Sequence, residues 1–142
     1  MAKECRRVIV VDPIRTRTAA AADLHLQPFP GSDAALAFAL LHVLRRDGLV
    51  DRDFIRNHTL GWEELEPLLD GCTPSWGEAT TGVPARLIDE AATHYAAGPS
   101  LLWLGQGLQR QATGGNIVRA CAMLPAVTGN IGKPGAGVSL CQ

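Results

Sequence analysis

The stretch 8–33, VIVVDPIRTRTAAAADLHLQPFPGSD, constrains the fold more than any other part of this 142-residue chain. It opens with four β-branched residues, Val8 to Val11, and such uninterrupted apolar runs are typical of strands buried on both faces of a parallel sheet. Asp12-Pro13 ends the run, because proline has no N–H to donate to a strand ladder. The Asp12 carboxylate is therefore predicted at the carboxyl end of a strand, where open α/β sheets bind their ligands.

A second polar loop follows a second short extended segment, Leu24 to Leu26. Proline and glycine residues turn the chain over 28–31, and Ser32-Asp33 stand at the start of a long apolar segment that ends at Arg46. We expect Asp33 to cap this helix, and the basic residues at its far end also suit the helix dipole. The two polar loops are thus placed to face one ligand at adjacent strand ends.

Further helices and one further strand are predicted downstream. Residues 49–71 form two short amphipathic segments, Thr73-Pro74 begins another short helix, and Pro84 begins an amphipathic helix that ends before Gly98. Ser100 to Leu104, SLLWL, is a second buried strand, and residues 117–124 form a helix that Pro125 kinks or ends. The glycine-rich run 128–137 is expected to be non-helical.

The order of strand, helices and strand predicts parallel pairing. We therefore expect an α/β fold, namely one three-layer Rossmann-like domain over residues 1–142. In it the runs Val8–Val11, Leu24–Leu26 and Leu101–Leu104 share one mainly parallel sheet with helices on both faces.

A glycine-rich polar loop, GQGLQRQATGGN, follows the strand that ends at Leu104. Its spacing matches neither the dinucleotide-binding fingerprint nor the phosphate-binding lysine loop, so by itself it identifies no ligand. It does place glutamines, backbone amides and Arg110 at the carboxyl end of another strand.

Composition excludes several classes of function. The net charge is −1 and the basic pairs are short, so no nucleic-acid surface is expected. The four cysteines are widely separated and form no CxxC pair, which argues against an iron–sulfur or zinc site. His42 is interpreted as a packed or half-exposed histidine rather than a ligand, and the acidic residues of 63–70 as a solvated helix face. No apolar segment is long enough to cross a bilayer, so the chain is expected to be cytoplasmic unless a targeting signal lies upstream.

Taken in order, the motifs resemble those of the molybdopterin oxidoreductases of the dimethyl-sulfoxide-reductase type, which include formate dehydrogenases and nitrate reductases. The segments that carry the resemblance are VIVVDPIRTRTAAAADLHL, PGSDAALAFALLHVL, LGQGLQRQATGGN and VRACAMLPAVTGNIGKPGAG. Together they cover most of the chain.

The resemblance implies a cofactor-binding role. In that family the corresponding region is one of two related α/β domains that hold a pair of molybdopterin guanine dinucleotides, with molybdenum or tungsten carried by the parent protein. The residues implied along the ribose and phosphates are Asp12, Pro13, Arg15 and Thr16, those at the guanine are Gly31, Ser32 and Asp33, and those at the pterin or pyrophosphate are Gln106, Gly107 and Arg110. A carboxylate suits guanine, because it accepts hydrogen bonds from the neighbouring N1–H and N2–H₂ donors together.

The resemblance also implies that some of the family's machinery lies outside these residues. The cysteine cluster of an iron–sulfur centre, the segment that supplies the molybdenum ligand and the C-terminal pterin-binding domain have no counterpart here. No catalytic residue, metal ligand or iron–sulfur cluster is therefore assigned to this segment. The expected partners are the remaining domains of a parent oxidoreductase, and the chain alone is expected to be inactive.

Three interpretations of the chain stay open from its residues. It is a cofactor-binding domain of a molybdenum or tungsten oxidoreductase, a stand-alone module that binds guanine nucleotides, or a structural module without redox activity.

Overall fold

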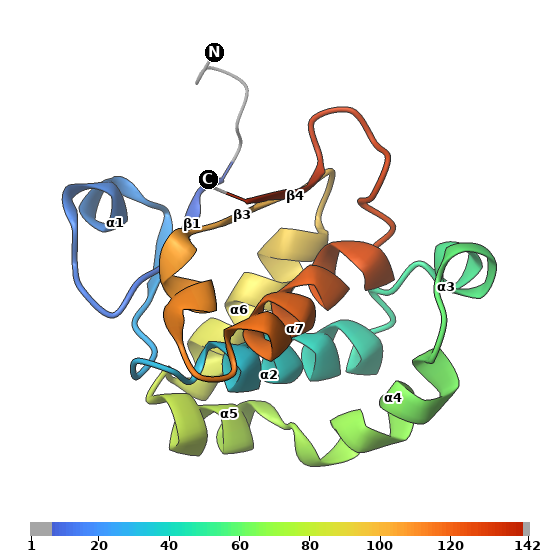
Figure 1. The fold of residues 1–142 in the computed structure, drawn as a ribbon, viewed down its shortest axis with the longest axis horizontal. Coiled ribbons are helices and arrows are strands. Elements are labelled where there is room, and N and C mark those ends of the chain that lie inside the picture. The colour runs from blue at the N-terminus through green and yellow to red at the C-terminus, as the bar shows by residue number, and fades with distance from the viewer. Residues whose placement is uncertain (1–6, 141–142) are drawn as a thin grey trace.

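The computed structural model describes residues 7–140 as a mixture of helices and short strands (Figure 1). In chain order the elements are β1 (Ile9–Val11), α1 (Arg17–Ala21), β2 (Leu24–Leu26), α2 (Asp33–Arg46), α3 (Arg52–His58), α4 (Trp62–Leu68), η1 (Leu69–Gly71), α5 (Pro74–Thr81), α6 (Ala85–Ala96), β3 (Leu101–Leu104), η2 (Gln106–Arg110), α7 (Gly114–Val127) and β4 (Gly137–Leu140), where η denotes a 3₁₀ turn. We call residues 50–72, which carry α3, α4 and η1, the arm.

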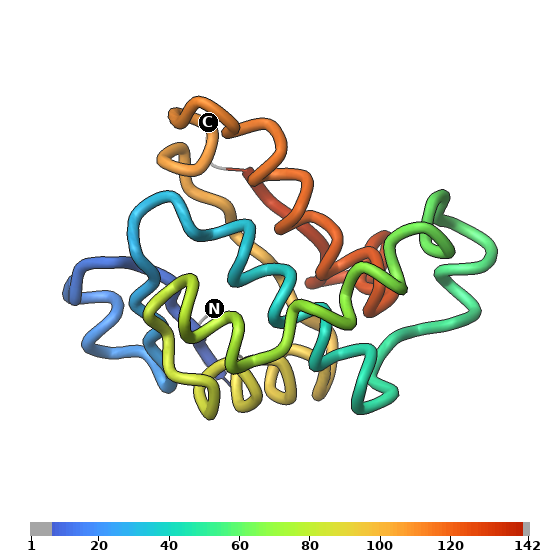
Figure 2. The backbone as a smooth tube through the Cα atoms, turned by 90° about the horizontal axis from the view of Figure 1, so that it is seen from below, coloured from blue at the N-terminus to red at the C-terminus, as the bar shows by residue number. Residues whose placement is uncertain are grey.

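Helix α2 is the centre of the core. It packs against α5, α6 and α7, and Figure 2 shows it passing between them when the molecule is seen from below. Leu41 and Leu44 are fully buried, and burial of a leucine side chain contributes about 1.5–3 kcal/mol. Gly77 of α5 permits the close approach of the helices, because a Cβ there would lie 2.7 Å from the Cβ of Ala39. The expectation that this helix is enclosed by other elements is confirmed.

The strands form two small parallel sheets. β1 pairs with β2, with Ile9 opposite Leu24 and Val11 opposite Leu26. β3 pairs with β4, with Leu101 opposite Gly137 and Trp103 opposite Ser139. The α/β class and the parallel pairing agree with the sequence analysis, and β4 was not anticipated, because the glycine-rich run before it masks its short apolar pattern.

The single sheet predicted from the sequence is not formed among the described residues. β1 and β2 belong to one sheet and β3 to another, so the three apolar runs do not share a ladder. Full burial of these runs is also wrong: Val11 is 48% exposed, Leu101 50% and Trp103 68%. Figure 1 shows α2, α6 and α7 on one side of β1, β3 and β4, while α1 contacts β1 and β2.

Helix boundaries follow the sequence pattern except in α1, which was not predicted, and in α7. This helix begins at Gly114 and continues through Pro125 to Val127, so Pro125 does not end it. The reason is that Pro125 lies in the last turn, where its missing N–H costs one bond. The following amides remain bonded, Thr128 N–H to the carbonyl of Leu124 and Asn130 N–H to that of Pro125.

Within residues 7–140, no helix combines the length and apolar character needed to cross a membrane.

Candidate functional site

Three loops at the carboxyl ends of β1, β2 and β3 lie next to one another. We call the surface formed by residues 12–16, 27–33 and 105–113 the strand-end edge. The first two loops are joined by the bonds of Asp12 N–H to the carbonyl of Leu26 (3.0 Å) and of Gln27 Nε2 to the carbonyl of Pro13 (3.2 Å). The second and third loops meet at Gly31, where a Cβ would lie 3.0 Å from Oε1 of Gln111.

The first loop is shaped by its own polar side chains. Asp12 Oδ1 accepts from the N–H of Ile14 (2.8 Å), and Thr16 Oγ1 accepts from the N–H of Ala19 (3.2 Å) and thereby caps α1. These two groups therefore stabilise the local fold of the loop. The guanidinium of Arg15 is exposed and forms no ion pair with a described residue.

The second loop is anchored by Phe29. Its N–H donates to the carbonyl of Thr81 (2.8 Å), and its ring lies over Gly82, where a Cβ would come within 2.6 Å of the ring. Gly31 has φ +87°, a conformation that glycine adopts at little cost. The loop thus holds the start of α2 in place against α5.

The sequence predicted that Asp33 caps α2, and this prediction is wrong. The N-cap is Ser32, whose hydroxyl donates to the carbonyl of Phe29 (2.7 Å) and makes no capping bond. Asp33 is the first helical residue, is half-buried, and its carboxylate forms no hydrogen bond with described residues. Both carboxylate oxygens are therefore left available to a ligand with paired N–H donors.

The third loop presents the start of α7. Thr113, the N-cap residue, makes no side-chain capping bond, as Ser32 makes none at α2. Helices α1, α3 and α5 are instead capped by Thr16, Asp51 and Thr73. Helix starts whose N–H groups lack a side-chain cap favour negatively charged groups.

Two of the predicted site residues in this loop are Gln106 and Gly107. The side-chain oxygen of Gln106 accepts a hydrogen bond from Arg110 (3.2 Å). Gly107 is exposed, and a Cβ there would meet no atom within 4 Å. Arg110 forms no ion pair with a described residue. Gln111 was not identified from the sequence, although it meets Gly31. A lone glutamine in a polar loop gives no signal of such a contact until the chain is folded.

No group of three or more His, Cys, Asp or Glu side chains in the described part of the chain is arranged to hold a metal ion. Cys121 of α7 is buried, and burial together with nearby Asp33 raises the pKa of its thiol to about 11. A protonated thiol is a poor metal ligand.

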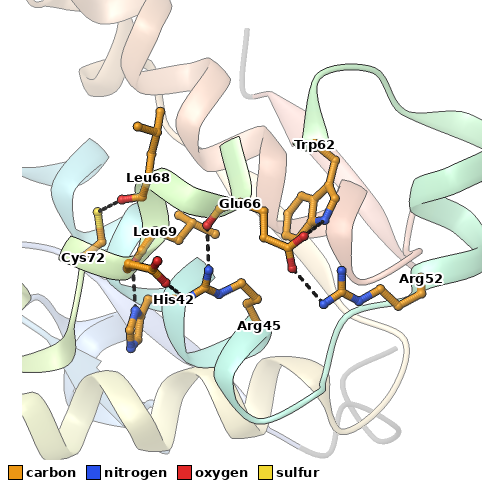
Figure 3. Close-up of polar contacts among 9 residues, drawn as sticks. His42, Arg45, Arg52, Trp62, Glu66, Leu68, Leu69 and Cys72 are labelled. Carbon is orange, nitrogen blue, oxygen red and sulfur yellow. Dashed lines mark hydrogen bonds and ion pairs between the residues drawn. The ribbon is translucent and has the colours of Figure 1, made fainter. Parts of the chain in front are cut away.

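The arm carries polar contacts that belong to the fold. Figure 3 shows Glu66 receiving hydrogen bonds from Trp62 Nε1 (2.9 Å) and pairing with Arg52 (2.8 Å), while Arg45 donates to the carbonyl of Glu66 (2.7 Å). His42 Nδ1 lies 2.7 Å from the carbonyl of Leu69, which confirms a packed histidine. Hollows of about 230 and 320 Å³ lie along the arm, and no predicted cofactor residue lines either.

Residues 1–141 match the family model of the molybdopterin oxidoreductases, and the chain belongs to this family. The strand-end loops described above fall within the match. Family membership implies a molybdopterin cofactor that carries molybdenum or tungsten.

Relatives with known names place the chain among enzymes of the dimethyl-sulfoxide-reductase type. It is 45% identical over 135 residues to F420-dependent formate dehydrogenase 1 subunit alpha of Methanococcus maripaludis, covering 94% of this chain and 20% of that protein. It is 40% identical to formate dehydrogenase H of Escherichia coli, covering 94% and 19%. The solved acetylene hydratase of Pelobacter acetylenicus superposes with a TM-score of 0.83 at 29% identity, covering 90% of this chain and 18% of that one. The chain spans about one fifth of the length of these relatives.

Proposed function

We propose that this chain is a molybdopterin guanine dinucleotide-binding domain of a formate dehydrogenase-like oxidoreductase. The observation that carries the proposal is the strand-end edge, which combines a carboxylate without a hydrogen-bond partner, two guanidinium groups without an ion pair, and two helix starts without side-chain caps among the described residues. Each is a feature that the dinucleotide requires: a carboxylate for guanine, and cations and N–H groups for the phosphates.

In this proposal the parts of the edge have separate roles. Asp33, with Gly31 and Ser32, binds guanine, because its two oxygens accept from adjacent N–H donors. Arg15 and the loop of Asp12, Pro13 and Thr16 lie along the ribose and phosphates, and Arg110, with Gln106 and Gly107, meets the pyrophosphate or pterin. The metal held by the pterins supplies the redox chemistry when it is bound, and the residues of this chain bind and orient the nucleotide.

The edge is an open surface rather than a closed pocket. We infer that the second wall comes from other domains of a parent oxidoreductase, consistent with relatives five times as long. The chain alone should therefore show no formate oxidation or nitrate reduction. Turnover of either substrate with a dye acceptor, above a metal-free blank, would contradict this.

The guanine assignment is tested by equilibrium dialysis of the chain with labelled GDP, and with ADP for comparison. We expect GDP to bind more tightly, and Asp33→Asn to weaken GDP binding by about 1.5–3 kcal/mol, the range for a hydrogen bond to a charged group. Asparagine keeps the shape of the side chain but replaces one acceptor oxygen by an N–H₂ group that faces donors of guanine.

Asp53→Asn is the matched control. Asp53 also lies in the first turn of a helix, α3, but it is outside the strand-end edge and 85% exposed. Both substitutions remove one favourable charge from a helix start, worth about 0.3–1 kcal/mol of stability. If the two variants bind GDP equally well, Asp33 does not recognise guanine.

A further inference from the structure

Three consecutive residues of the chain, 25–27, hold the first loop of the strand-end edge. Asp12 N–H donates to the carbonyl of Leu26 (3.0 Å) and so continues the β1–β2 ladder. The ring of His25 lies with Nε2 2.9 Å from the carbonyl oxygen of Asp12. Gln27 Nε2 donates to the next carbonyl, that of Pro13 (3.2 Å). Two side chains therefore fix two successive carbonyl groups where the chain leaves β1.

His25 makes the more protected of these two side-chain bonds. It is half-buried, whereas Gln27 is exposed. A carbonyl oxygen only accepts hydrogen bonds, so Nε2 of His25 carries the hydrogen and donates it. Leu24 and Leu26, the other residues of β2, are buried, so the strand needs no polar residue for its packing. The bond to Asp12 is the contact that a histidine provides here and an apolar residue would not.

The bonds inside the loop leave one residue, Arg15, without a partner. Asp12 Oδ1 accepts from the N–H of Ile14 (2.8 Å), and Thr16 N–H donates to the carbonyl of Ile14 (2.9 Å). Neither the backbone N–H nor the guanidinium of Arg15 has a hydrogen-bond partner among the described residues. Both kinds of group bind phosphate oxygens. The loop thus presents two donors at one residue.

Apolar packing does little to fix the position of this loop. Ile14 is 69% exposed, and Arg15 is exposed as well. Helix α1, into which the loop leads, makes its main contacts with β1 and β2 and lies at the periphery of the fold (Figure 1). A segment with few buried apolar contacts opens at low cost unless hydrogen bonds hold it. The position of the loop therefore depends on its bonds to residues 25–27.

We propose that His25 is a positioning residue for phosphate binding at the strand-end edge. Its Nε2–H holds the carbonyl of Asp12, and the loop then presents the N–H and guanidinium of Arg15 to a diphosphate. His25 acts through the loop and makes no contact with the nucleotide. The identity of the ligand rests on the proposed function, whereas the hydrogen bond does not.

Equilibrium dialysis with labelled GDP and labelled guanosine tests this role, because guanosine has the same base and ribose but no phosphates. His25→Phe keeps a ring but removes the donor. We expect it to weaken GDP binding by about tenfold and guanosine binding by less than about twofold. His25→Gln, which keeps an N–H donor on its side chain, should bind GDP within about threefold of the wild-type chain.

His42→Phe is the matched control. The His42 ring also bonds to a backbone carbonyl, that of Leu69 (2.7 Å), but it lies outside the strand-end edge. Its loss should lower the stability to denaturant and leave the affinities for GDP and guanosine unchanged in the folded chain. A histidine that only stabilises the fold would behave in this way at either position.

Three binding results would overturn the inference. Equal losses of GDP and guanosine affinity in His25→Phe would mean that His25 supports the whole domain. Unchanged affinities in His25→Phe, or the same loss in His25→Gln, would mean that the donor is not needed. Equal affinity of the wild-type chain for GDP and guanosine would mean that there is no phosphate contact for the loop to position.

Amide hydrogen exchange measured by NMR tests the hydrogen bond without any nucleotide. We expect the Asp12 amide to exchange about tenfold faster in His25→Phe, relative to the amides of α2, and at the wild-type rate in His25→Gln. An unchanged rate in His25→Phe would overturn the inference even if GDP binds. Equal binding of GDP and ADP would overturn only the guanine assignment of the proposed function, so the two failures are distinguishable.

Discussion

At the end of α2 and along the arm, arginine side chains are neutralised by the fold. Arg45, Arg52 and Arg56 pair with Asp70, Glu66 and Asp53 of the same region. At the strand-end edge, Arg15 and Arg110 form no ion pair with a described residue. The helix starts do not separate the regions as cleanly: α3 in the arm is capped by Asp51, but α4 in the arm has no side-chain cap, and neither have α2 and α7 at the strand-end edge.

The difference separates charge that stabilises the fold from charge that is left for a ligand. Arg45 is 17% exposed and bonds to a backbone carbonyl as well as to Asp70, so its loss would leave acceptors unsatisfied. Among the described residues Arg15 has no such partner and Arg110 bonds only to the exposed side chain of Gln106, so their removal should change binding rather than stability. Three predictions test this contrast.

The largest effect is expected at the junction of η2 and α7. In Gly114→Ala, the new Cβ would clash with the carbonyl oxygen of Gln109, so the third loop must move. We expect a loss of about 3 kcal/mol in the free energy of unfolding and a loss of GDP affinity of about tenfold or more. Chemical denaturation and dialysis measure the two effects.

Gly115→Ala is the matched control for that junction, because its Cβ would meet no atom within 4 Å. Alanine there should leave GDP binding unchanged and stabilise α7 by up to about 1 kcal/mol. If the two variants have the same stability and the same GDP affinity, the third loop does not depend on the close contact between Gly114 and Gln109.

The next largest effects are expected when one arginine from each region is replaced and stability and GDP binding are compared. Arg45→Met should lower the free energy of unfolding by about 2 kcal/mol, because two hydrogen bonds are lost near a part-buried carbonyl. Arg110→Met should change stability by no more than about 0.5 kcal/mol but weaken GDP binding. A large loss of stability in Arg110→Met would mean that the edge arginine serves the fold.

The smallest effect is the pH dependence that Cys121 contributes. An unfolded thiol ionises near pH 9, whereas the folded thiol has its pKa raised to about 11 by burial and by Asp33. Between these values the unfolded state has lost the proton and the folded state keeps it, so stability falls as pH rises. We expect a fall of about 1–2 kcal/mol between pH 9 and 11.

Cys121→Ala should reduce this fall, as followed by denaturant unfolding at several pH values. Asp33→Asn should reduce it slightly, since the negative charge near the thiol is removed. If neither substitution changes the dependence of the free energy of unfolding on pH, another group causes it. One such group is Tyr95, because burial raises its pKa to about 12.

Local patterns in the sequence were sufficient for much of the secondary structure. β2 and the extent of α2 follow the apolar runs and their flanking residues, and Thr73 caps α5 as its spacing indicates. The polar loops were also located correctly at strand ends, because a proline or glycine after an apolar run is a local signal. These features depend on neighbours along the chain.

The sequence alone determined the α/β class, the order of the main helices and of three strands, and the polar loops that end those strands, but neither α1 nor β4. Only the tertiary structure decided that the strands form two sheets, that Ser32 rather than Asp33 is the cap of α2, and that Gln111 meets Gly31. It also decided which arginines stay unpaired. The physical reason is that strand pairing, ion pairing and contacts between loops join residues far apart in the sequence, so a local pattern specifies the groups but not their partners.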